Sequence, residues 1–256
     1  MSLQLAQTLD GPADAQPLVL SGSLGTTSRL WEPQLEEFAK RFRVLRHDHP
    51  GHGRSPVPTE AFSVEDEARA VIALADEAGF ERFAYCGLSL GGMIGMWVSV
   101  LAPERVVSLT LCCTGAKLGT SEEWFDRAAT VREEGVQAFL PRLRERWFTP
   151  AFRETEAAKA CFDEVLKVPP EGYARCCEAV GGFDFRSDLE RIQAPTLILV
   201  GEEDPLTPPE VTELLSERIA GSTATIVRNA AHLASVEQAD FVTAAMLRHL
   251  EAKAPA

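Results

Sequence analysis

The pentapeptide Gly87-Leu88-Ser89-Leu90-Gly91 lies between two apolar stretches, RFAYCGL (82–88) and MIGMWVSVLA (93–102). The first is typical of a strand buried on both faces, and the second of a buried helix, so the pentapeptide joins a strand to a helix. Glycines on both sides of a serine allow a sharp, strained turn that exposes the hydroxyl. Ser89 is therefore a candidate nucleophile; the alternative is an ordinary turn in which the serine only caps the helix.

Five further apolar runs alternate with amphipathic stretches along the chain: PLVLS (17–21), FRVLRHD (42–48), VVSLTLCC (106–113), PTLILVG (195–201) and TATIVRN (223–229). This alternation predicts an α/β fold with a mostly parallel sheet covered by helices on both faces.

The alternation stops between residues 117 and 186, where the pattern indicates helices and no strand. We interpret this stretch as a helical lid over the carboxyl edge of the sheet; an independently folding helical domain is the alternative. The lid (117–186) then divides the core into a first part (1–116) and a second part (187–256).

A serine needs a base to take its proton and an acid to orient that base. At such a strand-to-helix turn the expected chain order is serine, acid, histidine. Asp204 follows the run PTLILVG and precedes a proline, which places it on a loop at the end of a strand; Glu202 and Glu203 are its rivals. His232 lies after the last predicted strand and has both the right order and a loop position. The three residues predict a serine hydrolase.

Two backbone amides are expected to bind the oxyanion that forms when the serine attacks a carbonyl. They belong to Leu90, directly after the nucleophile, and to Leu24, in the glycine-flanked segment SGSLG (21–25). This segment lacks the lysine of a phosphate-binding loop, and we find neither a dinucleotide fingerprint nor a clear metal-ligand spacing. No cofactor and no metal are expected.

The formal net charge of −13 argues against nucleic acid or an anionic membrane as a partner. No apolar run is long enough to span a membrane, and the first residues do not resemble a secretory signal, so we expect a cytoplasmic protein. An anionic substrate would need a local cluster of arginine or lysine to overcome the general field. The sequence gives no indication of the oligomeric state.

A family resemblance follows from several motifs. The segment DHPGHGRS (48–55) is similar to the D-x-x-G-x-G-x-S loop of α/β hydrolases, and we interpret it as a turn that braces the active-site wall. Together with SLGT (23–26), WEPQL (31–35), GLSLGG (87–92), RWFTP (146–150) and GEEDPLTPP (201–209), it resembles the 3-oxoadipate enol-lactonases over nearly the whole chain. One departure is Gly22, where relatives usually carry a polar side chain such as Asn or His.

The resemblance implies hydrolysis of 3-oxoadipate enol-lactone to 3-oxoadipate, a step in bacterial catabolism of protocatechuate and catechol. Its substrate is a small lactone that carries a carboxylate. In the lid segment RLRERW (142–147), Arg146 could bind this carboxylate beside an aromatic wall formed by Trp147. Alternatively, the arginines form a solvated face, and Leu143 and Trp147 belong to the core.

Two other functions compete with this one. The same triad could serve a broad-specificity carboxylesterase or perhydrolase that acts on neutral substrates. Less expected is a ligand-binding protein that keeps the fold but has lost the chemistry.

Overall fold

The computed structural model describes residues 3–252, so the outermost ends of the predicted core parts, residues 1–2 and 253–256, lie outside the described residues. The described residues form one seven-stranded sheet in the order β1-β3-β2-β4-β5-β6-β7. β1 pairs antiparallel with β3, and every other pair is parallel. The strands are β1 (Gln7–Asp10), β2 (Gln16–Ser21), β3 (Phe42–His47), β4 (Phe83–Leu88), β5 (Val106–Cys112), β6 (Thr196–Gly201) and β7 (Thr223–Val227).

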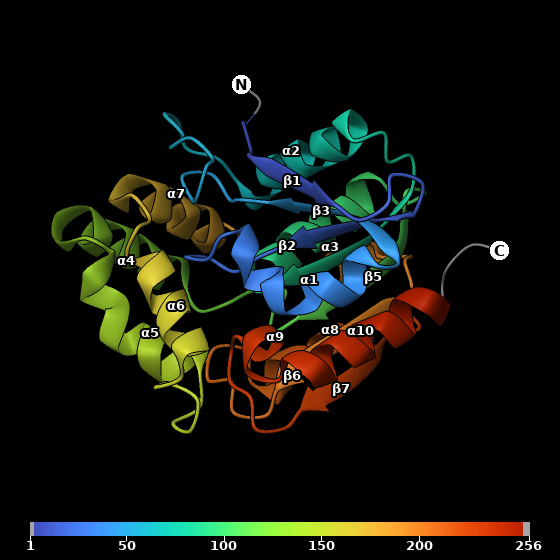
Figure 1. Cartoon of the computed structure of the whole chain (residues 1–256). Helices are drawn as coiled ribbons and strands as arrows, with labels where there is room; N and C mark the ends of the chain where they lie inside the picture. Colours follow the sequence, from blue (N-terminus) through green and yellow to red (C-terminus); the bar gives the residue numbers. More distant parts are fainter. Residues whose placement is uncertain (1–2, 253–256) are drawn as a thin grey trace.

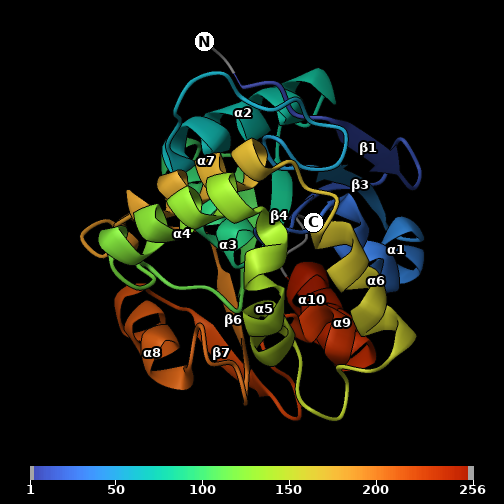
Figure 2. The same ribbon diagram turned by 90° about the vertical axis from the view of Figure 1, so that its left-hand side faces the viewer.

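Helices cover both faces of this sheet. In Figure 2, α1 and α10 lie to the right of β4 and β6, while α8 lies to the left. The helices of the core are α1 (Glu32–Ala39), α2 (Val64–Glu77), α3 (Leu90–Leu101), α8 (Pro209–Arg218), α9 (Ala234–Glu237) and α10 (Ala239–Ala252), with short 3-10 helices η1 (Ser28–Trp31) and η3 (Leu189–Arg191). This arrangement confirms the predicted α/β fold.

The central strands are apolar because they have no exposed face. All six residues of β4 and all six of β6 are buried. β7, at the edge of the sheet, is largely exposed. The sequence patterns located the six parallel strands but not β1, a half-buried edge strand of four residues that lacks an apolar run.

The stretch between residues 117 and 186 contains helices and no strand, as its pattern indicated. These helices are α4 (Ser121–Glu134), η2 (Val136–Phe139), α5 (Leu140–Trp147), α6 (Glu156–Val165) and α7 (Pro170–Gly181). Figure 1 shows α4, α5, α6 and α7 gathered on one side of the sheet. We keep residues 117–186 as the proposed extent of the lid.

Aromatic side chains at the end of α5 and from α6 form an apolar centre. Trp147 stacks on Phe162 with ring centroids 6.1 Å apart, and Phe148 meets the same ring edge-on at 5.7 Å. This packing joins α5 to α6. Within residues 3–252, no helix is both long enough and apolar enough to cross a membrane.

Candidate active site

Ser89 occupies a strained turn between β4 and α3. Its backbone has φ 55° and ψ −112°, a conformation that is costly for a residue with a side chain. The flanking glycines are required, because a Cβ on Gly87 would lie 2.1 Å from the carbonyl oxygen of Gly91, and a Cβ on Gly91 would lie 2.3 Å from that of Ser21. The turn therefore presses the start of α3 against the end of β2.

Asp204 and His232 meet although they are 28 residues apart in the sequence. The Nδ1 atom of His232 lies 2.8 Å from Oδ2 of Asp204, and each residue is only 2% exposed. Burial favours the neutral form of Asp204, but the imidazole and the hydroxyl and amides of the next turn outweigh it and hold the pKa of this carboxyl below its usual value. An ionised Asp204 accepts a hydrogen bond from the Nδ1–H of His232, which leaves Nε2 free to act as a base.

The loop of His232 is held by the end of helix α5. The amide of His232 donates to the carbonyl of Arg146 at 3.3 Å, and the amide of Leu233 donates to the carbonyl of Trp147 at 2.9 Å. These bonds involve only the backbone of α5. A change in the side chain of Arg146 therefore leaves the support of His232 in place.

Two amides are available where an oxyanion is expected. Among residues 3–252, the backbone N–H groups of Leu24 and Leu90 donate to no protein acceptor. The loop of Leu24 is braced from within, because the Thr26 hydroxyl donates to the Ser23 carbonyl at 2.8 Å and accepts from the Ser23 amide at 3.0 Å. A Cβ on Gly22 would lie 2.8 Å from this hydroxyl, so Thr26 fills the space next to Gly22.

Ser89 opens into a hollow between the end of the sheet and helices α4 and α5. This hollow has a volume of about 590 Å³, within the usual range for sites of small ligands. Its lining includes three arginines and two exposed acids beside Ser89 and apolar side chains: Ser89, Glu123, Trp124, Asp126, Arg127, Phe139, Arg142, Arg146 and Leu206. A narrow extension also touches Leu24, Leu143, Trp147 and His232. All the predicted site residues except Asp204 and Leu90 thus line one continuous region, and Asp204 lies directly behind His232.

Three arginines of this region have no ion-pair partner among the described residues. Arg127, Arg142 and Arg146 all lack a carboxylate within 4.0 Å, whereas Arg144, on the same helix as two of them, pairs with Glu154 at 2.6 Å. Burial lowers the pKa of Arg146, and the charges of Arg142 and Arg127 lower it further. The charges of Glu123 and Glu145 act in the opposite direction but more weakly, so repulsion among the arginines outweighs them.

Comparison with known proteins identifies the fold family of this chain. Residues 16–239 match the family model described as the alpha/beta hydrolase fold. The chain belongs to the α/β-hydrolase fold family.

Two relatives and one solved structure illustrate how similar this chain is to other members of the family. The chain is 36% identical to 3-oxoadipate enol-lactonase 2 of Acinetobacter baylyi over 230 residues, which cover 89% of this chain and 86% of the relative. It is 30% identical to the putative carbamate hydrolase RutD of Variovorax paradoxus over 257 residues, 97% of this chain and 96% of the relative. The crystal structure of the enol-lactonase from Burkholderia xenovorans LB400 superposes with a TM-score of 0.93 at 34% identity and covers 96% of both chains.

Arg127 of this α/β hydrolase was missed in the sequence. It comes from α4, whereas Arg142 and Arg146 come from α5, and no spacing relates the two helices. In the structure, its guanidinium lies 5.0–5.2 Å from the ring centroids of Trp124, Phe139 and Tyr173 and donates to the Tyr173 hydroxyl. An arginine in an aromatic environment is partly desolvated, which strengthens its attraction for an anion.

Trp147 combines the two roles between which the sequence could not decide. It is 2% exposed and stacks on Phe162, so it belongs to the apolar centre of the lid. It also lines the narrow extension beside Ser89 and His232. Arg142, in contrast, is largely exposed, and Arg146 is half-buried.

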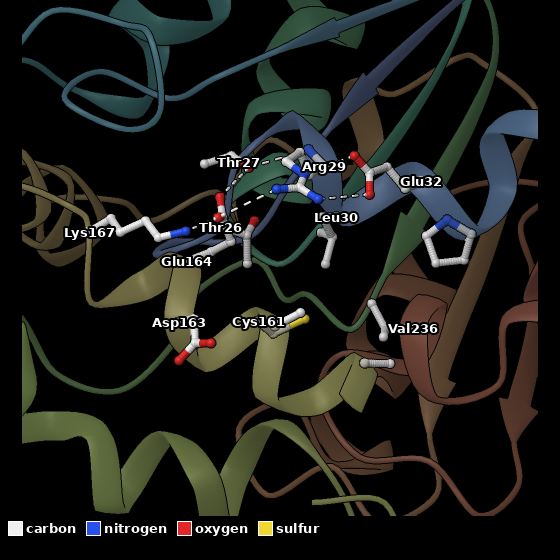
Figure 3. A pocket seen from close by; sticks show the side chains of 13 residues that line it. Thr26, Thr27, Arg29, Leu30, Glu32, Cys161, Asp163, Glu164, Lys167 and Val236 are labelled. Carbon is white, nitrogen blue, oxygen red and sulfur yellow. Dashed lines mark hydrogen bonds and ion pairs between the residues drawn. The ribbon is translucent and has the colours of Figure 1, made fainter. Parts of the chain in front are cut away.

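A second hollow in this α/β hydrolase, of about 290 Å³, lies between η1 and α6 (Figure 3). Both of its cations are paired, because Arg29 contacts Glu32 at 2.9 Å and Glu164 at 3.7 Å, and Lys167 contacts Glu164 at 2.7 Å, while Asp163 adds a further negative charge. It contains neither a triad residue nor an unpaired arginine, so it offers less to an anionic substrate than the hollow above Ser89.

Proposed function

We propose that this protein is a serine hydrolase that opens the ring of 3-oxoadipate enol-lactone, with Ser89, Asp204 and His232 as its catalytic triad. The observation that carries this proposal is the group of unpaired arginines in the same hollow as Ser89, in a protein whose net charge is −13. An acidic protein that keeps cations without partners above its nucleophile is suited to an anionic substrate. The similarity to enol-lactonases supports the choice of this anion.

The first half of the proposed reaction forms an acyl-enzyme. His232 accepts the proton of the Ser89 hydroxyl while the oxygen attacks the lactone carbonyl. The negative charge that develops on the carbonyl oxygen is stabilised by the amides of Leu24 and Leu90. Asp204 holds His232 in the required tautomer and stabilises its cationic form.

The ring bond then breaks and the acyl group is released. The ring oxygen leaves as an enolate, His232 returns the proton to it, and the resulting enol relaxes to the ketone. Because the substrate is a cyclic ester, the part that becomes the ketone stays attached to the acyl group on Ser89. Water, activated by His232, attacks this ester and releases 3-oxoadipate with a second carboxylate.

The arginines act at a distance from these bonds. Arg146 can grip the substrate carboxylate through two parallel hydrogen bonds, and Arg142 and Arg127 add to the positive field. Trp147 limits water on the inner side of this site. Their shared effect is to orient the lactone carbonyl toward Ser89. On this basis the protein belongs to a pathway of aromatic catabolism that passes through 3-oxoadipate.

The competing function is a broad esterase that acts on neutral substrates with the same triad. A matched pair of substrates separates the two: the enol-lactone with its free carboxylate and the same lactone with that carboxylate methylated. Ring opening of both is followed in the ultraviolet. The proposal predicts a kcat/KM for the anion at least about tenfold higher, since one charge-assisted hydrogen bond contributes about 1.5 kcal/mol or more. Equal values would favour the broad esterase. A carbamate is tested in parallel because of the likeness to RutD.

A further inference from the structure

Three histidines at and after the end of β3 hold the loop that carries Leu24. The Nε2 atom of His47 lies 3.0 Å from the Ser21 hydroxyl, and that of His49 lies 3.0 Å from the Gly22 carbonyl oxygen. The Gly25 amide donates to Nε2 of His52 at 3.1 Å. The chain order excluded these histidines from the triad, and the motif that contains them was assigned only a bracing turn.

The Gly22 carbonyl joins the two halves of the proposed oxyanion site. It accepts one hydrogen bond from His49 and a second from the Gly91 amide at 2.8 Å. Gly91 directly follows Leu90, and Gly22 lies two residues before Leu24. A displacement of this carbonyl therefore changes the position of one oxyanion donor relative to the other.

His49 depends in turn on Glu67 of helix α2. Its Nδ1 atom lies 2.6 Å from the Glu67 carboxylate, and the side chains are 1% and 0% exposed. Because a carbonyl oxygen can only accept, Nε2 of His49 must carry a proton to bond Gly22. A neutral His49 would then present a lone pair to a carboxylate. The pair therefore keeps one additional proton on Nδ1 or on Glu67.

The ionisation of this pair differs from that of its neighbours. Burial opposes a charge on His49, but the Glu67 carboxylate outweighs it and raises the pKa of His49 above its ordinary value of 6.5. Burial lowers the pKa of His47 to about 3 and that of His52 to about 4, so both stay neutral.

The titratable groups packed around the pair come from the same loop, from β4 and from α7. Burial raises the pKa values of Tyr85 (β4) and of Tyr173 and Cys176 (α7) well above neutrality. The pKa of Asp48 is lowered, because hydrogen bonds from Ser28 and Arg54 outweigh its burial. None of these neighbours changes its charge as the pH rises past neutrality, whereas the raised pKa of His49 means that this group does lose its charge as the pH rises above 6.5.

We propose that His49 and Glu67 are positioning residues, whose shared proton keeps the Leu24 loop in place for oxyanion binding. This inference rests on the proposed hydrolase function. Loss of the proton leaves a lone pair facing a carboxylate, the His49 ring moves, and the Gly22 carbonyl loses its donor. Since an oxyanion forms only in the transition state, kcat then falls while KM changes little. A raised pKa means that this support is complete below 6.5 and is lost as the pH rises through the raised value.

The decisive variant is Glu67→Gln. Its side-chain amide can donate to Nδ1 of a neutral His49, which still donates from Nε2 to Gly22, so no shared proton is needed. We expect wild-type kcat on a neutral aryl ester to fall about tenfold at alkaline pH, less than the 10²–10³ that follows removal of an oxyanion donor. Glu67→Gln is expected to lose this alkaline decline while KM stays near the wild-type value. Ser89→Ala gives the background rate of ester hydrolysis at each pH, and circular dichroism shows whether the proteins stay folded.

His47→Gln is the matched control. His47 belongs to the same cluster but stays neutral, so this variant is expected to keep the alkaline decline. His49→Phe removes the donor to Gly22 at every pH and is expected to keep kcat near the low alkaline value of the wild type, without an alkaline decline. If Glu67→Gln does not fold, nuclear magnetic resonance of the His49 ring in the wild type replaces it, and its ionisation must coincide with the decline in kcat.

Two results overturn the inference: an active wild type whose kcat does not fall at alkaline pH, or a Glu67→Gln variant that keeps the full decline. The inference is also overturned if His49 ionises at a pH different from that at which kcat declines. A wild type that hydrolyses no ester or lactone at any pH refutes the proposed function itself, and this inference with it.

Discussion

Replacement of Arg146 by alanine tests the proposed anion site. The side chain of Arg146 lines the hollow above Ser89 without a carboxylate partner, and only its backbone supports His232. Arg146→Ala should therefore weaken binding of the substrate carboxylate and leave the triad intact. The enol-lactone should lose activity, and its methyl ester should not.

The size of the loss follows from the position of the side chain. Hydrogen bonds to charged groups contribute about 1.5–3 kcal/mol. Arg146 is half-buried, and Arg142 and Arg127 remain to attract the anion, so we expect the lower part of this range, about 1.5–2 kcal/mol. This corresponds to a decrease in kcat/KM of about 10- to 30-fold on the enol-lactone. On the methyl ester the change should stay within about threefold, the scatter of ordinary surface substitutions.

Arg144→Ala is the matched control for this measurement. Arg144 lies on the same helix but pairs with Glu154 and contacts the ring of Phe162, with its guanidinium 4.9 Å from the centroid. It should affect the two substrates equally. Steady-state kinetics of wild type, Arg146→Ala and Arg144→Ala on both substrates give the comparison. An equal loss on both substrates in Arg146→Ala would show that this arginine supports the lid, and no loss on either would refute its role.

Four further expectations concern the turn, the base and the buried histidines. Ser89→Ala should lower kcat by about 10⁶ with an unchanged thermal melt, and a tenth of the activity remaining would exclude Ser89 as nucleophile. On the acid side, kcat/KM should fall, because a histidine that already carries a proton cannot accept the proton of Ser89; a flat profile would exclude a histidine base. His47 and His52 are neutral in the fold with pKa values of about 3 and 4, so protonation of the unfolded chain should remove stability as the pH falls below 6.5, by about 2 kcal/mol each at pH 5. Thermal melts from about pH 7 to 4 measure this loss, which a pH-independent melting temperature would contradict. Gly91→Ala should displace the turn and cost about 1–3 kcal/mol of stability together with most of the activity; a fully active variant would show that the contact with Ser21 is not close.

The sequence indicated those parts of the fold that depend on local patterns. β4 and β6 were located because strands buried on both faces must be apolar throughout. β1 was missed because a short edge strand is held by its pairing with β3 and needs no apolar run of its own.

The candidate site likewise contains residues that the sequence predicted and residues that it did not. Chain order and loop position were enough to select Asp204 and His232, which lie in contact. Arg127 and the pair of His49 and Glu67 were not found, because their partners come from other helices and loops. Whether a histidine becomes neutral or charged depends on the group that burial places beside it, and the sequence pattern does not contain this information.

The central claim is that Ser89 opens an anionic enol-lactone. It is tested most directly by adding 3-oxoadipate enol-lactone to equal concentrations of the wild-type protein and of Ser89→Ala and following the loss of the lactone in the ultraviolet. The account predicts rapid, complete loss of the lactone with the wild type. With Ser89→Ala it predicts only the rate at which the lactone is lost spontaneously in buffer. A wild type that leaves the lactone at the buffer rate, or a Ser89→Ala variant that consumes it as fast as the wild type, would contradict the account.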